Sequence, residues 1–297
     1  MLRLHEHGRA GPRRLSASRL LAWYEPRRAA YPWRAAPHPF GVLVSEVMLQ
    51  QTQVSRVVPA YLRFLARFPT PAALAAAPLA EVLRAWKGLG YNRRAAALWR
   101  AAGIIVAEHA GAVPSDPAAL GALPGVGPYT AAAVASFAFG AAVPAIDTNV
   151  RRVVARHRLG LDPQGGAAVR RAAEAWIDRT DPGAWNAALM DLGREVCRPE
   201  PRCAGCPLRR GCRFRARALP GGTRPPGRGG EPFAGSMRQL RGRIVDAARE
   251  APTVTVAEVA ARWGEPHERV AEAVAALAGE GLVRAGPGGR VTLGNGN

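Results

Sequence analysis

Two carboxylic acids in the sequence, Glu46 and Asp147, stand in different surroundings. Glu46 lies in the run Ser45–Leu49, where burial among apolar side chains would keep its carboxyl group protonated. Asp147 directly precedes a helical pattern, and a carboxylate at the mouth of a groove stays ionised. A protonated acid with an ionised carboxylate is the pair that cleaves a glycosidic bond. Beside Glu46, the amides of Gln50 and Gln51 could fill the gap left by a flipped base.

The alternative roles of these acids are structural. Taken alone, Glu46 could be a solvent-facing residue of a helix, and Asp147 or Thr148 could cap the helix that follows. Capping is compatible with catalysis, because a capping carboxylate can also stabilise a positive charge that develops on a sugar. The presence of both acids therefore favours the catalytic interpretation.

A turn with two glycines, Leu123–Gly127, lies between the two acids in sequence and between two helical patterns. Gly125 and Gly127 allow a tight hairpin in which backbone N–H groups, including that of Val126, face outward at the start of a helix. Such groups bind a phosphate, because the helix dipole and the unpaired N–H groups both favour an anion. An ordinary turn is the simplest alternative. No Walker-type lysine follows, so the pattern favours a helix-hairpin-helix contact with the DNA backbone over a nucleotide pocket.

All four cysteines lie close together and could hold a metal centre. Their spacing is Cys197-x5-Cys203-x2-Cys206-x5-Cys212, in a segment whose other residues are mostly Arg, Pro and Gly. Disulfides are not expected in a reducing compartment. Structural zinc and a 4Fe–4S cluster are both compatible with four thiolates. The cluster is favoured over zinc, because zinc ribbons usually have two C-x2-C knuckles and this segment has one.

The composition indicates a polyanionic partner. The chain of 297 residues has 41 Lys and Arg against 22 Asp and Glu, a net charge of +19, with Lys87 as its single lysine. The alternative is compositional drift toward Arg and Ala. An apolar content of 48% excludes disorder throughout. Neither a secretory signal nor an unbroken apolar stretch long enough to span a membrane can be identified.

The spacing of apolar residues predicts an all-α body before residue 280, with no strand. Apolar residues recur at helical spacing from 40 to 68, and Ser115-Asp116-Pro117 has the residues of a helix start, with Ser115 as the cap. Residues 31–34 are expected to form a turn. Helices are expected at about 15–24, 71–77, 79–86, 91–110, 128–139, 148–158, 166–179 and 183–196.

The C-terminal residues form a separate module. Three helices at about 237–249, 256–263 and 267–279, followed by a hairpin of residues 282–284 and 290–293, are the pattern of a winged helix. Its net charge is only +1, so DNA contact and a structural or protein-contact role remain equally open. The predicted domains are an arm and helix (1–35), a six-helix bundle with the hairpin (36–146), a cluster lobe (147–217), a linker (218–236) and a winged-helix-like domain (237–297).

The sequence resembles the MutY family of adenine DNA glycosylases, within the helix-hairpin-helix base-excision glycosylases. The resemblance covers about residues 15–217, and the segment around Glu46 is highly specific. The residues that carry it are Pro32-Trp33-Arg34, Val44–Thr52, Gly88–Tyr91, Leu123–Gly127, Asp147 with Asn149, Met190–Gly193 and the cysteines. It implies a two-lobed helical fold that binds double-stranded DNA with a mispaired base in its cleft, and a 4Fe–4S cluster.

The resemblance also implies roles for individual residues. Glu46 would protonate N7 of adenine, Asp147 would stabilise the oxocarbenium-like sugar or bond to it, Asn149 would position water and Tyr129 would support the sugar or the carboxylate. The remaining residues expected to contact DNA include Gln51 and Tyr91, which match residues that wedge into the base stack; the full set is Arg34, Gln50, Gln51, Thr52, Tyr91, Gly125, Val126 and Gly127.

Tyr129 separates two modes of action. Related bifunctional glycosylases have a lysine at this position, which forms a Schiff base and cuts the strand. Tyrosine cannot do so, and Lys87 lies elsewhere. The sequence therefore predicts a monofunctional glycosylase that leaves an abasic site.

Three departures from the family pattern concern specificity and the cluster. The first two cysteines are separated by five residues instead of the usual six, and Ala187 stands where many members have Glu or Gln. A winged-helix-like module replaces the Nudix-like domain that reads 8-oxoguanine.

Two other functions fit parts of the pattern. One is a thymine or uracil mismatch glycosylase on the same fold, since Tyr129 also suits that group, although the segment Gln50–Thr52 favours adenine. The other is a non-catalytic iron–sulfur regulator, which the presence of both Glu46 and Asp147 disfavours. The overall expectation is a monomeric, cytoplasmic enzyme of base excision repair, associated with the nucleoid when bound to DNA and making no contact with membranes.

Overall fold

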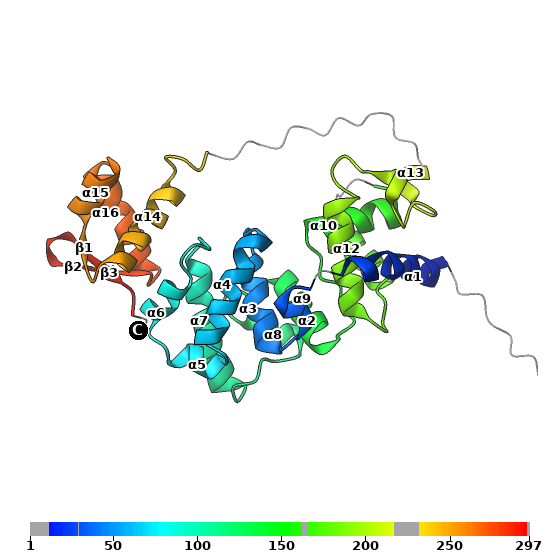
Figure 1. Ribbon diagram of the computed structural model, residues 1–297, viewed down its shortest axis with the longest axis horizontal. Coiled ribbons are helices and arrows are strands. Elements are labelled where there is room, and N and C mark those ends of the chain that lie inside the picture. The colour runs from blue at the N-terminus through cyan, green and yellow to red at the C-terminus, as the bar shows by residue number, and fades with distance from the viewer. Residues whose placement is uncertain (1–11, 29, 162–165, 217–231, 296–297) are drawn as a thin grey trace, which may run out of the picture. The chain divides into compact units, whose positions relative to one another are not determined.

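A computed structural model describes residues 12–28, 30–161, 166–216 and 232–295 (Figure 1). The predicted N-terminal arm before residue 12 and the predicted linker up to residue 231 lie outside these residues. The chain divides into two units, Met1–Pro37 with Ser115–Leu120 and Gly127–Arg224, and His38–Pro114 with Gly121–Val126 and Pro225–Asn297. We call them unit 1 and unit 2. Both are mainly helical, which confirms the predicted fold class.

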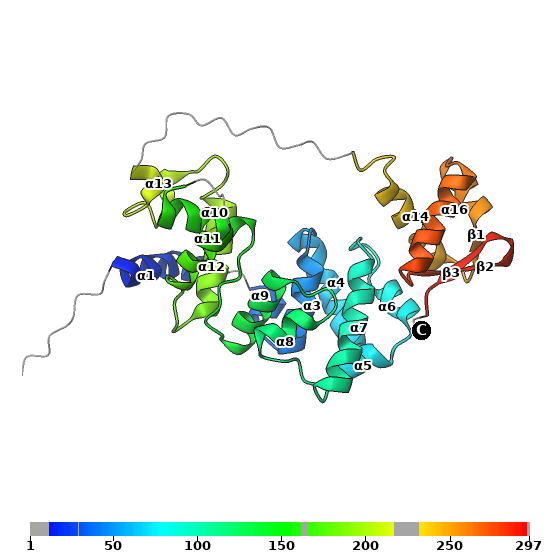
Figure 2. The ribbon, with the colours of Figure 1, turned by 180° about the vertical axis from the view of Figure 1, so that it is seen from behind.

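Unit 1 contains the N-terminal helix and the segment with the cysteines. In both views α10 and α12 lie side by side, and α1 and α9 also pack against α12 (Figure 1, Figure 2). Its helices are α1 (Pro12–Tyr24), α2 (Pro32–Ala35), α9 (Pro128–Phe139), α10 (Thr148–Val154) with the π-turn η2 (Ala155–Leu159), α11 (Gly166–Glu174), α12 (Pro182–Glu195) and α13 (Arg213–Ala216), with 3-10 turns η1 (Glu25–Arg27) and η3 (Cys203–Gly205). Helix α8 (Pro117–Ala122) has residues in both units.

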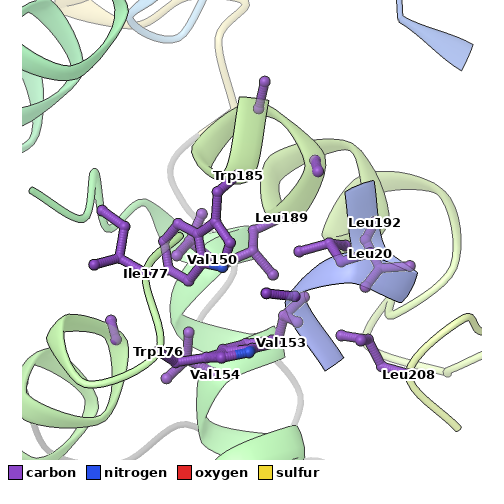
Figure 3. Packing of buried hydrophobic residues seen from close by; sticks show 14 of the residues in the cluster. Leu20, Val150, Val153, Val154, Trp176, Ile177, Trp185, Leu189, Leu192 and Leu208 are labelled. Carbon is purple, nitrogen blue, oxygen red and sulfur yellow. The ribbon is translucent and has the colours of Figure 1, made fainter. Parts of the chain in front are cut away.

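The core of unit 1 is built around two tryptophans. Trp176 and Trp185 meet edge to face with ring centroids 5.6 Å apart, an arrangement that aromatic quadrupoles favour. Aliphatic side chains of α1, α10 and α12 close around them, among them Leu20, Val153 and Leu189 (Figure 3). Such burial stabilises by roughly 25 cal/mol per Å² of apolar surface. The core therefore fixes α10, and with it the residues at its N-terminus.

A buried histidine makes this core sensitive to acid. His157 is 4% exposed, its ring lies 4.8 Å from that of Trp176, and its Nδ1 has no hydrogen-bond partner among the described residues. Burial, followed by the positive charges of Arg158 and Arg213, lowers the pKa of His157 to about 4.

The histidine is therefore neutral in the folded protein. The unfolded chain takes up its proton at a higher pH, so stability is present above the unfolded pKa and falls as the pH drops toward about 4. We expect a loss of up to about 3 kcal/mol in the free energy of unfolding across this window. Urea titrations at several pH values measure the free energy of unfolding. This free energy should change less steeply with pH for His157→Phe than for the wild type. An equal slope in both proteins would contradict this assignment.

Unit 2 combines a helical bundle with the C-terminal module. The bundle consists of α3 (Pro39–Leu49), α4 (Val54–Arg67), α5 (Pro71–Ala76), α6 (Leu79–Ala85) and α7 (Arg93–Glu108). The module consists of α14 (Met237–Glu250), β1 (Val254–Thr255), α15 (Val256–Trp263), α16 (His267–Gly279), β2 (Val283–Gly286), the 3-10 turn η4 (Pro287–Gly289) and β3 (Arg290–Leu293). Its antiparallel strands lie in the order β1-β3-β2, and β3 also contacts α6 of the bundle.

Three local expectations from the sequence are wrong. A strand does precede residue 280: β1 pairs Val254 with Val291, and a two-residue strand is too short to show an alternating pattern. Residues 32–35 form the helical turn α2, because the fixed φ of Pro32 suits a first helical position. The cap of α8 is Asp116, whose carboxylate accepts from the N–H of Ala119 at 2.9 Å, and not the preceding serine.

In the described part of the chain, no helix combines the length and apolar character needed to cross a membrane.

Candidate active site and DNA interface

Helix α3 buries the first predicted catalytic acid. Residues 40–48 are all buried, and Glu46 among them is 6% exposed. The helix ends at Leu49 with Gln50 as its C-cap, and the next residue, Gln51, is exposed with a φ of 57°. A non-glycine residue adopts this left-handed conformation only at a cost, which the surrounding structure must offset. The turn after α3 therefore exposes the amide of Gln51, which follows the buried Glu46 shortly in the sequence.

A half-buried arginine, Arg94, which the sequence analysis did not identify, holds this turn. Nη1 of Arg94 donates to the carbonyls of Val47 and Met48 at 2.8 and 2.9 Å and to that of Gln50 at 2.6 Å. Those carbonyls belong to the C-terminal end of α3, where intrahelical donors run out. Its Nη2 donates to Thr52 Oγ1 at 3.0 Å. Arg94 therefore satisfies the end of α3 and fixes the segment that follows it.

The same guanidinium joins α3 to a second loop. Nη2 of Arg94 also donates to the carbonyls of Leu89 and Gly90 at 3.1 and 3.2 Å. The guanidinium carbon of Arg94, Cζ, lies 5.4 Å from the ring centroid of Tyr91, a cation–π distance. Burial lowers the pKa of Arg94 to about 10, so the side chain stays charged at neutral pH. The two segments predicted to wedge into DNA are thus tied to one cation.

Arg94→Lys is expected to loosen both segments. An ammonium cannot reproduce the planar fork, and carbonyls would lose their donor. We expect the free energy of unfolding to fall by about 3 kcal/mol. Thermal melting measures the change, and Arg93→Lys on the neighbouring exposed residue is the matched control. Equal melting temperatures for the two variants would contradict the clamp.

The glycine hairpin lies where the sequence predicts a turn, but the predicted outward direction of the Val126 N–H group is wrong. Gly125 has a φ of 78°, and a Cβ there would lie 2.8 Å from Cβ of Ala97, so glycine is required. Its carbonyl accepts from Nε2 of Gln50 at 3.4 Å. Val126 is buried and its N–H donates to the carbonyl of Leu123, so that group is used inside the turn. Gly125 and Gly127 are exposed, and Gly127 is the N-cap of α9.

The second predicted acid lies at the N-terminus of α10 in unit 1. Oδ1 of Asp147 accepts from the N–H of Val150 at 2.7 Å, and Oδ2 accepts from Nδ2 of Asn149 at 2.9 Å. Asn149 in turn accepts from Nη2 of Arg152 at 2.8 Å. The two donors fix the orientation of the carboxylate at the helix N-terminus. The half-buried Asp147 is therefore both a helix cap and a fixed, oriented anion.

Two buried residues of α12 position this acid, and sequence reasoning missed both roles. Asn186 is fully buried and accepts from the N–H of Ala145 at 2.9 Å, while its amide donates to the carbonyl of Val143. A Cβ on Gly193 would lie 2.6 Å from Cβ of Asn149, so only glycine allows the close approach. Partners more than 40 positions apart leave no signal in a local pattern.

The other predicted residues of unit 1 have partners within the unit. The hydroxyl of Tyr129, on α9, donates to Sδ of Met190 at 3.8 Å. Arg34 lies 3.4 Å from the carboxylate of Asp191 and 5.3 Å from the ring of Tyr31. A guanidinium held in this way supports the fold, and contact between Arg34 and DNA stays a prediction. Ala187, a departure from the family pattern, is buried in the unit 1 core.

The four cysteines surround one pocket. Its empty space is about 340 Å³, and Cys197, Cys203, Cys206 and Cys212 line it together with Arg156. None is in a disulfide, and burial raises the pKa of the Cys206 thiol to about 11. Among the described residues, no three Cys, His, Asp or Glu side chains gather closely enough to hold a single metal ion. Four thiols that line one pocket could hold a metal centre.

The cysteine segment is connected to the acid of unit 1. Nε of Arg152 donates to the carbonyl of Cys197 at 2.6 Å, and Nη2 of the same side chain donates to Asn149. Arg156 donates to the carbonyls of Arg198 and Pro199 at 2.6 and 2.9 Å. These charged donors fix the entry of the segment against α10.

Comparisons with known proteins agree with this arrangement. Residues 44–179 match the family profile described as HhH-GPD superfamily base excision DNA repair protein. An adenine DNA glycosylase of Mycobacterium tuberculosis is 42% identical over 297 aligned residues, which cover 98% of this chain and 97% of that protein. The chain belongs to the adenine DNA glycosylase family of the HhH-GPD superfamily. It is thus a DNA glycosylase of base excision repair.

Other relatives differ in how much of their length corresponds to this chain. The adenine DNA glycosylase of Mycolicibacterium smegmatis is 43% identical over 285 residues, covering 94% of this chain and 96% of that protein. The human adenine DNA glycosylase is 41% identical over 212 residues, which are 67% of this chain but only 39% of that protein. The mycobacterial glycosylases therefore align with the C-terminal module as well as with the preceding region.

Solved structures share the fold over 69% of the chain. A thermostable thymine-DNA glycosylase aligns with a TM-score of 0.64 and 28% identity, covering 69% of this chain and 97% of that chain. Endonuclease III in a non-covalent complex with DNA aligns with a TM-score of 0.59 and 26% identity, covering 69% and 95%.

Proposed function

We propose that this glycosylase hydrolyses the N-glycosidic bond of adenine mispaired with 8-oxoguanine or guanine in double-stranded DNA. The observation that carries the proposal is the similarity to adenine DNA glycosylases along 98% of the chain. It is supported by two carboxyl groups in unlike environments, one buried on an apolar helix and one at a helix N-terminus.

Glu46 is the general acid of this proposal. Its carboxylic acid protonates N7 of the flipped adenine, which makes the base a neutral leaving group as the bond between C1′ and N9 breaks. Burial on α3 keeps water away from the proton before the substrate arrives. The proton lost later by the attacking water balances the one given to the base.

Asp147 stabilises the positive charge that develops on the sugar. Its carboxylate is oriented by Val150 and Asn149, so little rearrangement is needed when the charge appears. Asn149 positions the water that adds to C1′, and Tyr129 supports the sugar or the carboxylate. The products are free adenine and an abasic site.

The enzyme is monofunctional in this proposal. Strand cutting through a Schiff base needs a lysine amine at the sugar, and position 129 is tyrosine. The single lysine, Lys87, lies between α6 and α7, where it pairs with Glu250.

DNA binding in this proposal depends on the basic charge and on two turns that contain glycines, residues 88–91 and 125–127. Of the net charge of +19, +18 precedes residue 237. Gly125 and Gly127 contact the phosphate backbone, while Gln51 and Tyr91, both exposed with positive φ, enter the base stack, next to Gln50 and Thr52. The similarity to endonuclease III, which was solved in a complex with DNA, supports binding to DNA. We propose that the protein acts as a monomer and associates with the nucleoid while bound to DNA.

Cys197, Cys203, Cys206 and Cys212 hold a 4Fe–4S cluster in this proposal, in preference to zinc. Four thiolates around one pocket, flanked by Arg156, Arg209 and Arg215, form a donor set that suits such a group and its negative charge. When bound, the cluster would order the basic segment between Cys197 and Cys212. Broad absorbance near about 400 nm supports the cluster, and a colourless protein that contains zinc contradicts it.

A second candidate substrate is a mismatched thymine or uracil. The alignment with a thermostable thymine-DNA glycosylase at a TM-score of 0.64 is the observation that favours it. Both substrates would use the same acid pair and the same hairpin.

One experiment separates these possibilities. The protein is incubated with duplexes carrying A:8-oxoguanine, A:G, T:G or U:G, and half of each sample is treated with alkali before the strands are separated. We expect alkali-dependent cleavage at adenine only. Cleavage at T:G or U:G alone would overturn the choice of base, and equal cleavage without alkali would overturn monofunctional action.

A further inference from the structure

The loop between α6 and α7 presents an aromatic side chain in an uncommon backbone conformation. Tyr91 is 47% exposed with a φ of 46°, and Gly88 and Gly90 before it have φ values of 90° and 69°. Three positive φ values within four residues do not persist unless neighbouring structure holds them. The contacts on the two sides of this loop therefore decide where Tyr91 points.

One side of the loop is held from inside the bundle. Arg94 donates to the carbonyls of Leu89 and Gly90, and Nε1 of the buried Trp86 donates to the carbonyl of Gly90 at 3.1 Å. These contacts fix the middle of the loop. They do not reach Asn92, which follows Tyr91 and begins α7.

The other side is held by the C-terminal module. Arg249, in the last turn of α14, donates from Nη2 to Oδ1 of Asn92 at 2.7 Å and from Nε to the carbonyl of Leu83 at 2.9 Å. Its remaining nitrogen, Nη1, pairs with Asp246 at 2.5 Å, and the side chain is only 5% exposed. A buried guanidinium whose three nitrogens all have partners has one geometry, and it spans α6 and the start of α7.

Asn92 gives up its usual role to make this contact. Asparagine at an N-cap commonly accepts from a backbone N–H of the first helical turn. Asn92 is the N-cap of α7 and makes no such side-chain bond; its amide oxygen accepts from Arg249 instead. The position next to Tyr91 is thus connected to the module and not to its own helix.

The surrounding ion pairs are weaker. Lys87 lies 3.6 Å from Glu250 and Arg93 lies 3.8 Å from Glu280, with the two basic side chains 60% and 74% exposed. Exposed pairs of this kind contribute little. Arg249 is therefore the principal polar anchor described between the module and this loop.

We infer that the C-terminal module is a support for the DNA-inserting loop, with Arg249 as a positioning residue that holds Asn92 and thereby Tyr91. The inference rests on the proposed function, in which Tyr91 enters the base stack. It gives the nearly neutral module a role that needs no DNA contact of its own.

The test uses the full chain and four variants. Arg249→Ala removes the anchor, Arg249→Lys keeps the charge without the fork, Asn92→Ala removes the acceptor, and Arg284→Ala removes an exposed arginine of the same module. Circular dichroism melting first establishes that each variant folds. Single-turnover rates are then measured on an A:G duplex and on the same strand as single-stranded DNA, and 2-aminopurine beside the target adenine reports unstacking on binding.

Loss of the contact between Arg249 and Asn92 should lower the rate only on duplex DNA, where Tyr91 has to enter the base stack. We expect Arg249→Ala and Asn92→Ala each to lower the duplex rate about tenfold, the double variant to be no slower than either, and the single-strand rate to stay within twofold. Arg249→Lys should be intermediate, and Arg284→Ala should match the wild type. The 2-aminopurine signal should fall in the same order.

Several results would overturn the inference. Equal losses on duplex and single strand would show a general structural role, and a loss shared by Arg284→Ala would show that the module acts through its charge on DNA. Additive effects of Arg249→Ala and Asn92→Ala would show that the two residues act independently. If the wild type releases no base, the proposed function fails, and the 2-aminopurine signal still tests the support of the loop, because it requires only binding.

Discussion

Glu46→Gln is expected to abolish base release while leaving the protein folded. Glutamine has nearly the same shape, so α3 keeps its packing, but an amide cannot transfer a proton to the leaving base. Because general acid catalysis contributes 10²- to 10⁴-fold, we expect the single-turnover rate on an A:G duplex to fall by about 10³-fold. Rates measured with enzyme in excess isolate the chemical step from product release.

The control for this variant is Glu108→Gln, which makes the same change on an exposed face of α7. We expect its rate and melting temperature to equal those of the wild type. Binding of the Glu46→Gln variant to the mismatched duplex should also remain, because the loops that we propose contact DNA are unchanged. A Glu46→Gln enzyme with more than about a tenth of the wild-type rate would remove this residue from the mechanism.

Asp147→Asn is expected to have the second largest effect. Asparagine caps a helix as well as aspartate does, so the bond from the N–H of Val150 should persist, although an amide nitrogen in place of Oδ2 no longer accepts from Nδ2 of Asn149. We therefore expect only a small fall in the melting temperature. The substitution removes the negative charge that faces the developing cation. We expect the single-turnover rate to fall by about 10²- to 10³-fold, the usual loss for one preorganised electrostatic contact.

Asp116→Asn is a matched control, because Asp116 caps α8 with the same geometry and is assigned no part in the reaction. Its rate should equal that of the wild type. If both variants lose the same activity, the effect of Asp147→Asn comes from helix capping and not from charge at the sugar. Asp147→Ala should lose about 1 kcal/mol of stability in addition to the rate, since it also removes the cap.

The elements that could be predicted well from the sequence are those with local boundaries. Helix α9 begins at Pro128 and ends before Gly140, which has a φ of 67°. Helix α15 begins with a complete capping box at Thr255 and ends before Gly264, which has a φ of 65°. Caps and left-handed glycines act within a single turn, so their residue types are visible in the sequence.

The break between α3 and α4 could not be read from periodicity. Apolar residues recur at helical spacing through 40–68, yet the helix stops at Leu49 and resumes at Val54. What ends it is Arg94, 44 positions after Gln50, which offers donors to the last carbonyls of α3. A local window contains no trace of such a partner.

The candidate site likewise combines features that the local sequence indicates with features that depend on distant partners. The grouping of the cysteines around one pocket follows from their spacing, and the cap at Asp147 follows from its place before a helix. The residues that orient the site, Asn186 and Arg249, have no local signal. Asn186 contacts Ala145, 41 positions away, and Arg249 contacts Asn92, 157 positions away.

The most direct measurement of the central claim is the identity of the released base. The protein is incubated with an A:8-oxoguanine duplex and an A:G duplex, the strands are removed, and the supernatant is analysed by mass spectrometry. We predict one free adenine for each abasic site, with both strands intact, and none with Glu46→Gln. No free adenine from either duplex, under conditions in which the protein binds them, would contradict the account.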